Sequence, residues 1–168
     1  GVETTEHGLM LLLMGCTEAQ GYGITRPMPA VDIPAWLNNY IANSEWMAYT
    51  NKVYTKKEIK IKLFRLTLMQ WQKYFESSLN SPIDSNLKWS ILKRTKCYCG
   101  IWLQREKKEQ LFEESWLIRL KDAHNIMHDI ADDLFEQYQG DEIEAARKEL
   151  INLQIAIENM NRVLGQCE

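Results

Sequence analysis

The stretch DEIEAARKELINLQIAIENMNRVLG, residues 141–165, decides the fold class. Its apolar side chains recur at alternating spacings of three and four residues, at Ile143, Ala146, Leu150, Leu153, Ile157, Met160 and Leu164. Such a heptad seam is typical of an α-helix that buries one face against neighbouring helices. Gly140 precedes the pattern, Asp141 can cap it and Gly165 ends it. The sequence therefore predicts a long amphipathic helix over this stretch.

Three further stretches upstream carry an apolar seam of the same kind, and they predict helices at about 45–79, 84–100 and 104–138. The third of them places these residues on one face: Leu117, Leu120, His124, Met127, Ala131, Leu134 and Tyr138. The second carries Leu87, Ile91 and either Cys97 or Cys99 on its seam. Four helices with one seam each and short connections predict a mainly α fold, an antiparallel four-helix bundle.

Residues 1–42 differ in character from the rest, because three of the four prolines and three closely spaced glycines lie among them. Thr4 or Thr5 can cap a short helix through Leu9–Met14, which Gly15 would stop. We expect a short strand at Ala19–Ile24 and a last short helix in AWLNNYIA, residues 35–42. The predicted organisation is a first domain of residues 1–42 and a helical second domain of residues 43–168.

Composition limits the classes of function. A net charge of −3 argues against a nucleic-acid or anionic-membrane surface as the main role. The four cysteines, Cys16, Cys97, Cys99 and Cys167, do not form a disulfide pattern, so we expect a reduced, cytoplasmic protein. The apolar run LMLLLM, residues 9–14, is too short to span a membrane. Because the chain opens in mid-pattern without Met, we expect a segment of a longer protein.

Cys97, His124 and His128 form a candidate metal site. On a helix, His124 and His128 share a face that looks into the bundle, since His124 lies on the apolar seam. A thiolate with two imidazoles is a ligand set that zinc prefers. The alternative is that the two histidines form hydrogen bonds within the core and that Cys97 is a small buried apolar residue.

The motif Cys97-x-Cys99-Gly100-x-Trp102, followed by His124-x-x-x-His128, resembles the chemoreceptor zinc-binding (CZB) domain. The resemblance covers residues 45–140 and implies a helical bundle with a His/Cys/His/His zinc site. Domains of this family occur in bacterial chemoreceptors, diguanylate cyclases and related signalling enzymes.

One position departs from that family's pattern. The first ligand of the family lies in a His-x-x-aromatic motif, and Trp71 matches the aromatic residue. Leu68 stands where the histidine is expected. Three protein ligands would leave an open zinc site, and Cys99 could replace the fourth only if its helix ended or frayed at Gly100.

The first 37 residues resemble the end of an EAL domain, the cyclic di-GMP phosphodiesterase barrel. The resemblance rests on Gly1-Val2-Glu3-Thr4, Gly15-Cys16, Gln20-Gly21-Tyr22 and Arg26-Pro27-Met28-Pro29. It implies a short α/β fragment of a TIM-type barrel, with Gln20 at an active-site position and Glu3 on a neighbouring loop. Because the other strands that carry metal ligands lie outside this chain, we expect no phosphodiesterase activity from it.

These resemblances predict a sensory or regulatory domain of a bacterial cyclic di-GMP signalling protein, responsive to zinc. The expected partners are a second copy of the chain and adjacent signalling domains, with no nucleic acid and no direct membrane contact. A second hypothesis is a dimerisation module without metal, in which helix 141–164 pairs between chains. A third is an enzyme with an open zinc site and a general base among Asp129, Asp132 and Asp133, although these acids more often form a solvated face.

Overall fold

The computed structural model describes residues 1–50, 52–82 and 89–167 and divides the chain into two compact units, Gly1–Leu63 and Phe64–Glu168. The described helices are α1 (Thr5–Leu13), a 3-10 turn (Ala30–Asp32), α2 (Ile33–Asn39), α3 (Ser44–Thr50), α4 (Lys56–Leu79), α5 (Tyr98–Glu109), α6 (Glu114–Gln139) and α7 (Ile143–Gly165). The division falls inside α4, whereas the sequence predicted a boundary after residue 42. None of these helices is long and apolar enough to cross a membrane.

In the first unit, α1 packs against α3. The Thr4 side chain caps α1 by accepting a hydrogen bond from the His7 N–H at 3.2 Å, as the sequence predicted. Trp46 on α3 donates its indole N–H to the Thr5 carbonyl at 2.9 Å. Gly8 makes this contact possible, because a Cβ at that position would lie 2.4 Å from the Trp46 ring. The helix α3, expected in the second domain, therefore belongs with α1.

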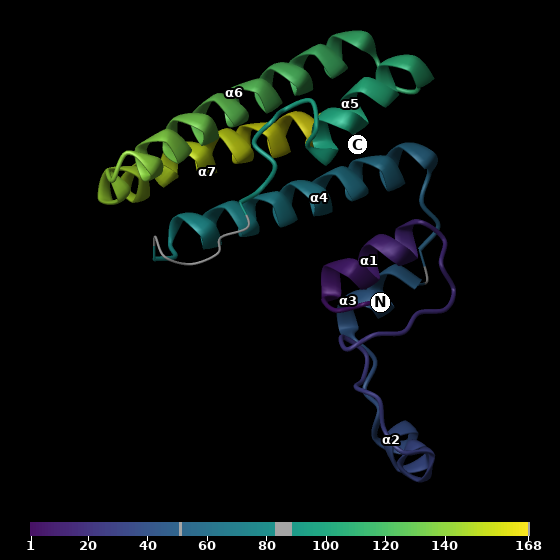
Figure 1. Cartoon of the computed structure of the whole chain (residues 1–168). Helices are drawn as coiled ribbons and strands as arrows, with labels where there is room; N and C mark the ends of the chain where they lie inside the picture. The colour runs from purple at the N-terminus through teal and green to yellow at the C-terminus, as the bar shows by residue number, and fades with distance from the viewer. Residues whose placement is uncertain (51, 83–88, 168) are drawn as a thin grey trace. The chain divides into compact units, whose positions relative to one another are not determined.

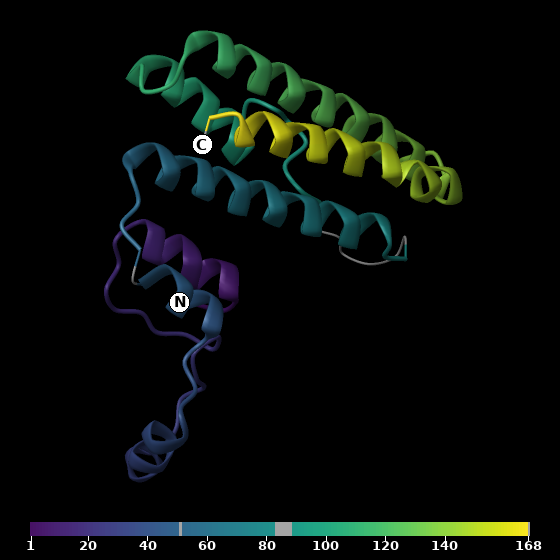
Figure 2. The same cartoon turned by 180° about the vertical axis from the view of Figure 1, so that it is seen from behind.

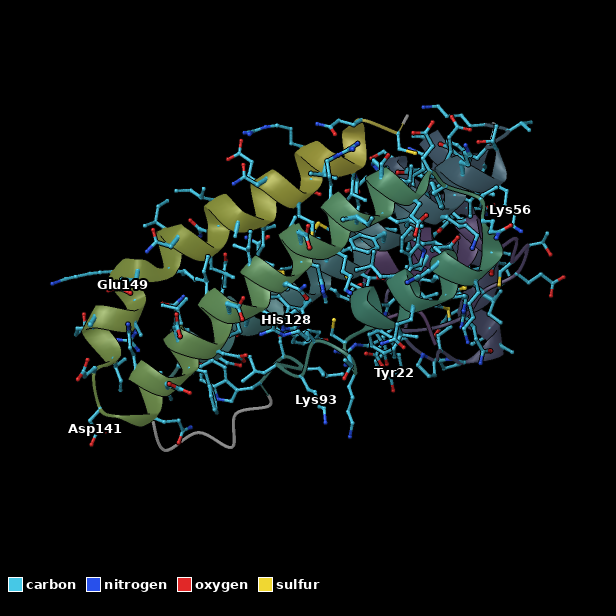
Figure 3. All side chains as sticks on the ribbon, turned by 90° about the horizontal axis from the view of Figure 1, so that it is seen from above. Tyr22, Lys56, Lys93, His128, Asp141 and Glu149 are labelled. Atoms are coloured by element: carbon cyan, nitrogen blue, oxygen red, sulfur yellow. The ribbon has the colours of Figure 1, made fainter. Side chains whose placement is uncertain are left out.

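In the second unit, α6 and α7 run antiparallel and lie side by side in both views (Figures 1 and 2). The turn between them contains Asp141, labelled in Figure 3. The end of α4 is joined to this pair by hydrogen bonds from Arg147 to the Leu79 carbonyl at 3.2 Å and from Tyr138 to the Ser81 carbonyl at 3.2 Å. The helix α5 packs against the start of α6. The second unit is thus a helical arrangement with α6 and α7 antiparallel, and α5 is its shortest helix.

The seams predicted on α6 and α7 form part of the core of this unit, and α4 adds Phe64, Leu68, Trp71, Phe75 and Leu79 to it. On α7, the side chains of Ala146, Leu153, Ile157, Met160 and Leu164 are buried within the chain. On α6, the buried set contains Leu117, Leu120, His124, Met127, Ala131, Leu134 and Tyr138. The seam of α7 is thus covered by its own chain, so a pairing of this face between two chains would have to displace these contacts.

Four predicted elements are wrong. The helix predicted at 45–79 is two helices, α3 and α4, since residues 52–55 between them are not helical. No strand forms among the described residues, and Gly21 sits in a turn with φ 151° where a strand was expected at Ala19–Ile24. The strand of a TIM-type barrel is therefore absent from these residues. In place of a helix at 84–100, residues 89–96 are irregular, and Leu87 lies outside the described residues. The helix predicted at 104–138 is two helices, α5 and α6, because Gln110 adopts a left-handed conformation with φ 53° and ends α5.

Replacing the fully buried Leu134 with alanine should lower the free energy of unfolding of the second unit by about 2–5 kcal/mol, because a cavity remains in the α6–α7 core. Ile126→Ala is the control, since Ile126 lies on the same helix and is 55% exposed. Urea denaturation, followed by circular dichroism, measures the free energy of unfolding of both variants. Equal losses in the two variants would contradict the packing described for α6.

Candidate metal centre

Two elements of the second unit hold the candidate ligands. Cys97 is the N-cap of α5: its backbone is extended, with ψ 151°, and its sulfur accepts a hydrogen bond from the Gly100 N–H at 3.2 Å. His124 and His128 lie one turn apart on the buried face of α6 (His128 is labelled in Figure 3). Their ring centroids are 4.6 Å apart. A helix start and a helix face therefore bring all three side chains to one place.

Both imidazole rings point at the same sulfur atom. The Nε2 atom of His124 lies 3.0 Å from the Cys97 Sγ, and the Nε2 atom of His128 lies 3.3 Å from it. All three side chains are buried, at no more than 2% exposure. One donor atom from each residue lies within 4.8 Å of the others. The group could therefore hold a metal ion, as the sequence predicted.

Burial keeps all three groups uncharged in the absence of a metal. It lowers the pKa of His124 to about 3, with smaller contributions from His128 and Arg94. It lowers the pKa of His128 to about 4, which the Leu92 backbone partly opposes. Burial also raises the pKa of the Cys97 thiol, although backbone N–H groups at the start of α5 favour the thiolate. Both rings are thus neutral at pH 7, which is the form that binds metals.

The distances from the Cys97 sulfur to the two Nε2 atoms can be compared with the separation of ligand atoms in a zinc site. Bond lengths of about 2.3 Å to sulfur and about 2.0 Å to nitrogen, at a tetrahedral angle, separate the two ligand atoms by roughly 3.5 Å. The two sulfur–nitrogen distances of 3.0 and 3.3 Å need to widen by only a few tenths of an ångström to reach that value. Without a metal, the same contacts are hydrogen bonds whose direction depends on the tautomer of each ring, and the Cys97 thiol also donates to the Arg94 carbonyl at 3.5 Å. The two sulfur–nitrogen distances are therefore close to those of a metal site of this kind.

The loop before α5 is fixed against α6. The Arg94 guanidinium pairs with the Asp129 carboxylate and lies 3.9 Å from that of Asp132. The Arg94 carbonyl lies so close to Gly100 that a Cβ there would be 1.9 Å from it, and the same Cβ would be 3.3 Å from the His124 ring. Gly100 therefore allows the close approach that puts Cys97 against α6.

Of the two tryptophans that the sequence analysis singled out, Trp71 contacts the site and Trp102 does not. The Trp71 ring on α4 meets the His128 ring edge-on at 5.4 Å, and its indole N–H donates to the Ile91 carbonyl at 3.0 Å. Trp102 of the Cys-Gly-Trp motif packs instead against Phe64 at 5.0 Å and Phe112 at 5.5 Å. The motif's tryptophan thus packs α5 against α4, while Trp71 contacts His128.

Leu68 lies one turn before Trp71 on α4 and is 1% exposed. It lines a cavity of about 310 Å³ that Cys97 and Cys99 also line. Within the described residues, the metal-capable group contains only Cys97, His124 and His128, so Cys99 does not join it. The position expected to carry a fourth ligand is thus beside the site and holds an aliphatic side chain.

The remaining candidate residues lie elsewhere. Asp129 and Asp132 are engaged with Arg94 on an exposed face, and Asp133 is exposed, so no carboxylate of this trio belongs to the metal-capable group. Gln20 and Glu3 are exposed in the first unit, on neighbouring backbone segments joined by a hydrogen bond from the Val2 N–H to the Gln20 carbonyl at 2.7 Å.

Sequence reasoning missed Arg94, which holds the loop to α6 through its side chain and meets Gly100 through its carbonyl. No spacing rule points to it, because residues 89–96 follow neither a helical nor a strand period. A basic residue three positions before a cysteine is too common a pattern to indicate this role.

Comparisons of the chain with family models, with curated proteins and with solved structures find no match.

Gly100→Ala should move the loop and expose the buried thiols, because the new Cβ cannot share space with the Arg94 carbonyl. In a chain that also carries Cys16→Ser and Cys167→Ser, only Cys97 and Cys99 can react with a thiol reagent. We expect faster reaction with a thiol reagent and a loss of about 1–3 kcal/mol in stability. Gly140→Ala is the control, since its Cβ would meet nothing closer than 3.4 Å. Wild-type reactivity in Gly100→Ala would contradict the packing at Arg94.

Proposed function

We propose that the second unit is a zinc-binding sensory or regulatory domain of a bacterial cyclic di-GMP signalling protein. The observation that carries the proposal is the convergence of two neutral, buried imidazole nitrogens on the Cys97 sulfur. When bound, zinc would supply a positive charge that replaces the thiol proton and ties α5 to α6. Cys97, His124 and His128 would hold it.

The signalling context rests on the two resemblances. The Cys97-to-Trp102 motif with its two histidines resembles CZB domains, and residues 1–37 resemble the end of an EAL domain. In this proposal the chain itself is not an enzyme, and the parent protein is a cyclic di-GMP phosphodiesterase. A regulatory role requires two conformations with different affinities for the ligand. Metal binding would favour the conformation in which the start of α5 lies against α6.

Metal content tests the proposal directly. Protein purified without a chelator or a histidine tag should contain about one zinc per chain by elemental analysis, and Cys97→Ala/His124→Ala should contain none. The matched control, Cys16→Ala/His7→Ala, removes the same two kinds of side chain from the first unit and should retain zinc. Circular dichroism checks that each variant is folded. No zinc in folded wild-type protein would refute the proposal.

A histidine at position 68 should complete the ligand set. Leu68 and Cys97 line the same cavity, and Trp71, one turn further along α4, contacts His128. Leu68→His should therefore tighten zinc binding by about tenfold or more, measured by competition with a chromogenic chelator. Leu66→His provides the control on the same helix. If both variants bind zinc as the wild type does, position 68 does not face the metal.

The alternative function is a homodimerisation module without metal. Ile151 and Ile155 favour it, because they lie one turn apart on α7 and are about half exposed while the seam of that helix is buried. Light scattering on Ile151→Glu/Ile155→Glu would distinguish the two cases. A zinc-free dimer that this variant converts to a monomer would favour dimerisation as the function.

A further inference from the structure

The cavity beside Cys97 has the properties of a small-molecule site. It lies in the second unit, between α4, residues 89–91, the start of α5 and Met127 of α6. Its volume of about 310 Å³ is at the lower end of the roughly 300–1,000 Å³ typical of ligand pockets. Among the described side chains that line it, none is Asp, Glu, Lys, Arg or His, although such residues are frequent in the chain.

The walls of this cavity are held in place by hydrogen bonds and ring contacts. Trp71 donates to the Ile91 carbonyl at 3.0 Å, and the Ser90 hydroxyl donates to the Trp71 carbonyl at 2.7 Å. Trp71 also stacks on Phe75 at 5.3 Å, and Trp89 meets Phe75 edge-on at 5.4 Å. The rings that face the cavity are thus supported from behind. Because these side chains are already held in place, little conformational entropy is lost when a ligand binds.

The lining determines what could bind. Aromatic and aliphatic side chains, among them Trp71, Trp89, Leu68 and Met127, provide most of the surface. Gln70 and Thr67 add polar groups suited to orienting a ligand. A charged ligand would lose its hydration without meeting an opposite charge, which is costly. A flat uncharged ring would instead exchange water for contacts with the indole rings.

We propose that this cavity binds a small uncharged aromatic molecule, about the size of an indole. The site shares Cys97 with the metal-capable group but does not need a metal to form its walls. The proposal goes beyond zinc binding, and it can hold or fail independently of it. Such a molecule would be a ligand of the second unit that is separate from a metal ion.

Isothermal titration calorimetry with indole tests the proposal on the full chain, once after removal of metals with a chelator and once after addition of zinc. We expect saturable binding at one site per chain in the metal-free protein. Indole-3-carboxylate, which carries a charge at neutral pH, should bind about tenfold more weakly or not at all. Indole that does not bind, or a carboxylate that binds equally well, would overturn the proposal.

A matched pair of variants shows where the probe binds. Ile91 lines the cavity and Ile101 does not, while both are 41% exposed, so both can be changed without opening the core. Ile91→Trp should fill the space and weaken indole binding by about tenfold. Ile101→Trp should leave the affinity within about twofold. Equal affinities in the two variants would place the probe elsewhere and overturn the proposal, whereas loss of zinc alone would bear only on the metal function.

Discussion

The approach of two imidazole rings to the sulfur of Cys97 is the interaction on which the second unit depends. It can form only because α5 begins at Tyr98, so that the Cys97 backbone is extended and its side chain turns back over the helix start. Gly100 then leaves room for the Arg94 carbonyl, and the Arg94 side chain pairs with Asp129 on α6. Each of these features serves to hold a short loop against a long helix.

A buried thiol and two buried imidazoles are costly unless they satisfy one another or a metal ion. The sulfur and the two Nε2 atoms satisfy one another and the Gly100 N–H also donates to the sulfur, whereas the Nδ1 atom of His128 is buried without a hydrogen-bond partner among the described residues. A metal ion would replace the proton of the Cys97 thiol and would bind the sulfur and the two Nε2 atoms. In the proposal, metal binding would therefore need no change of fold and would hold α5 more firmly to α6.

The heptad seams predicted which faces of α6 and α7 are buried, because an apolar stripe of that length has to pack against another element, but they did not reveal the break at Gln110 that separates α5 from α6. The helix predicted at 84–100 failed for a reason that the seam cannot reveal. The Cys97 backbone is extended and caps α5, and the Ile91 carbonyl accepts a hydrogen bond from Trp71 on α4 rather than from its own helix. For the metal-capable group, the residue types and the spacing of His124 and His128 indicated the right residues, and the structure adds that both rings meet the Cys97 sulfur. The contribution of Arg94 was not predictable, because it depends on long-range contacts.

X-ray absorption at the zinc edge of the zinc-loaded chain would identify the atoms that bind the ion. We expect one sulfur at about 2.3 Å and two imidazole nitrogens at about 2.0 Å, with one further light atom completing a four-coordinate ion. The sulfur contribution should vanish in Cys97→Ala and persist in Cys99→Ala. A spectrum with only oxygen and nitrogen ligands, or with two sulfurs, would contradict the assignment of Cys97, His124 and His128 as the metal centre.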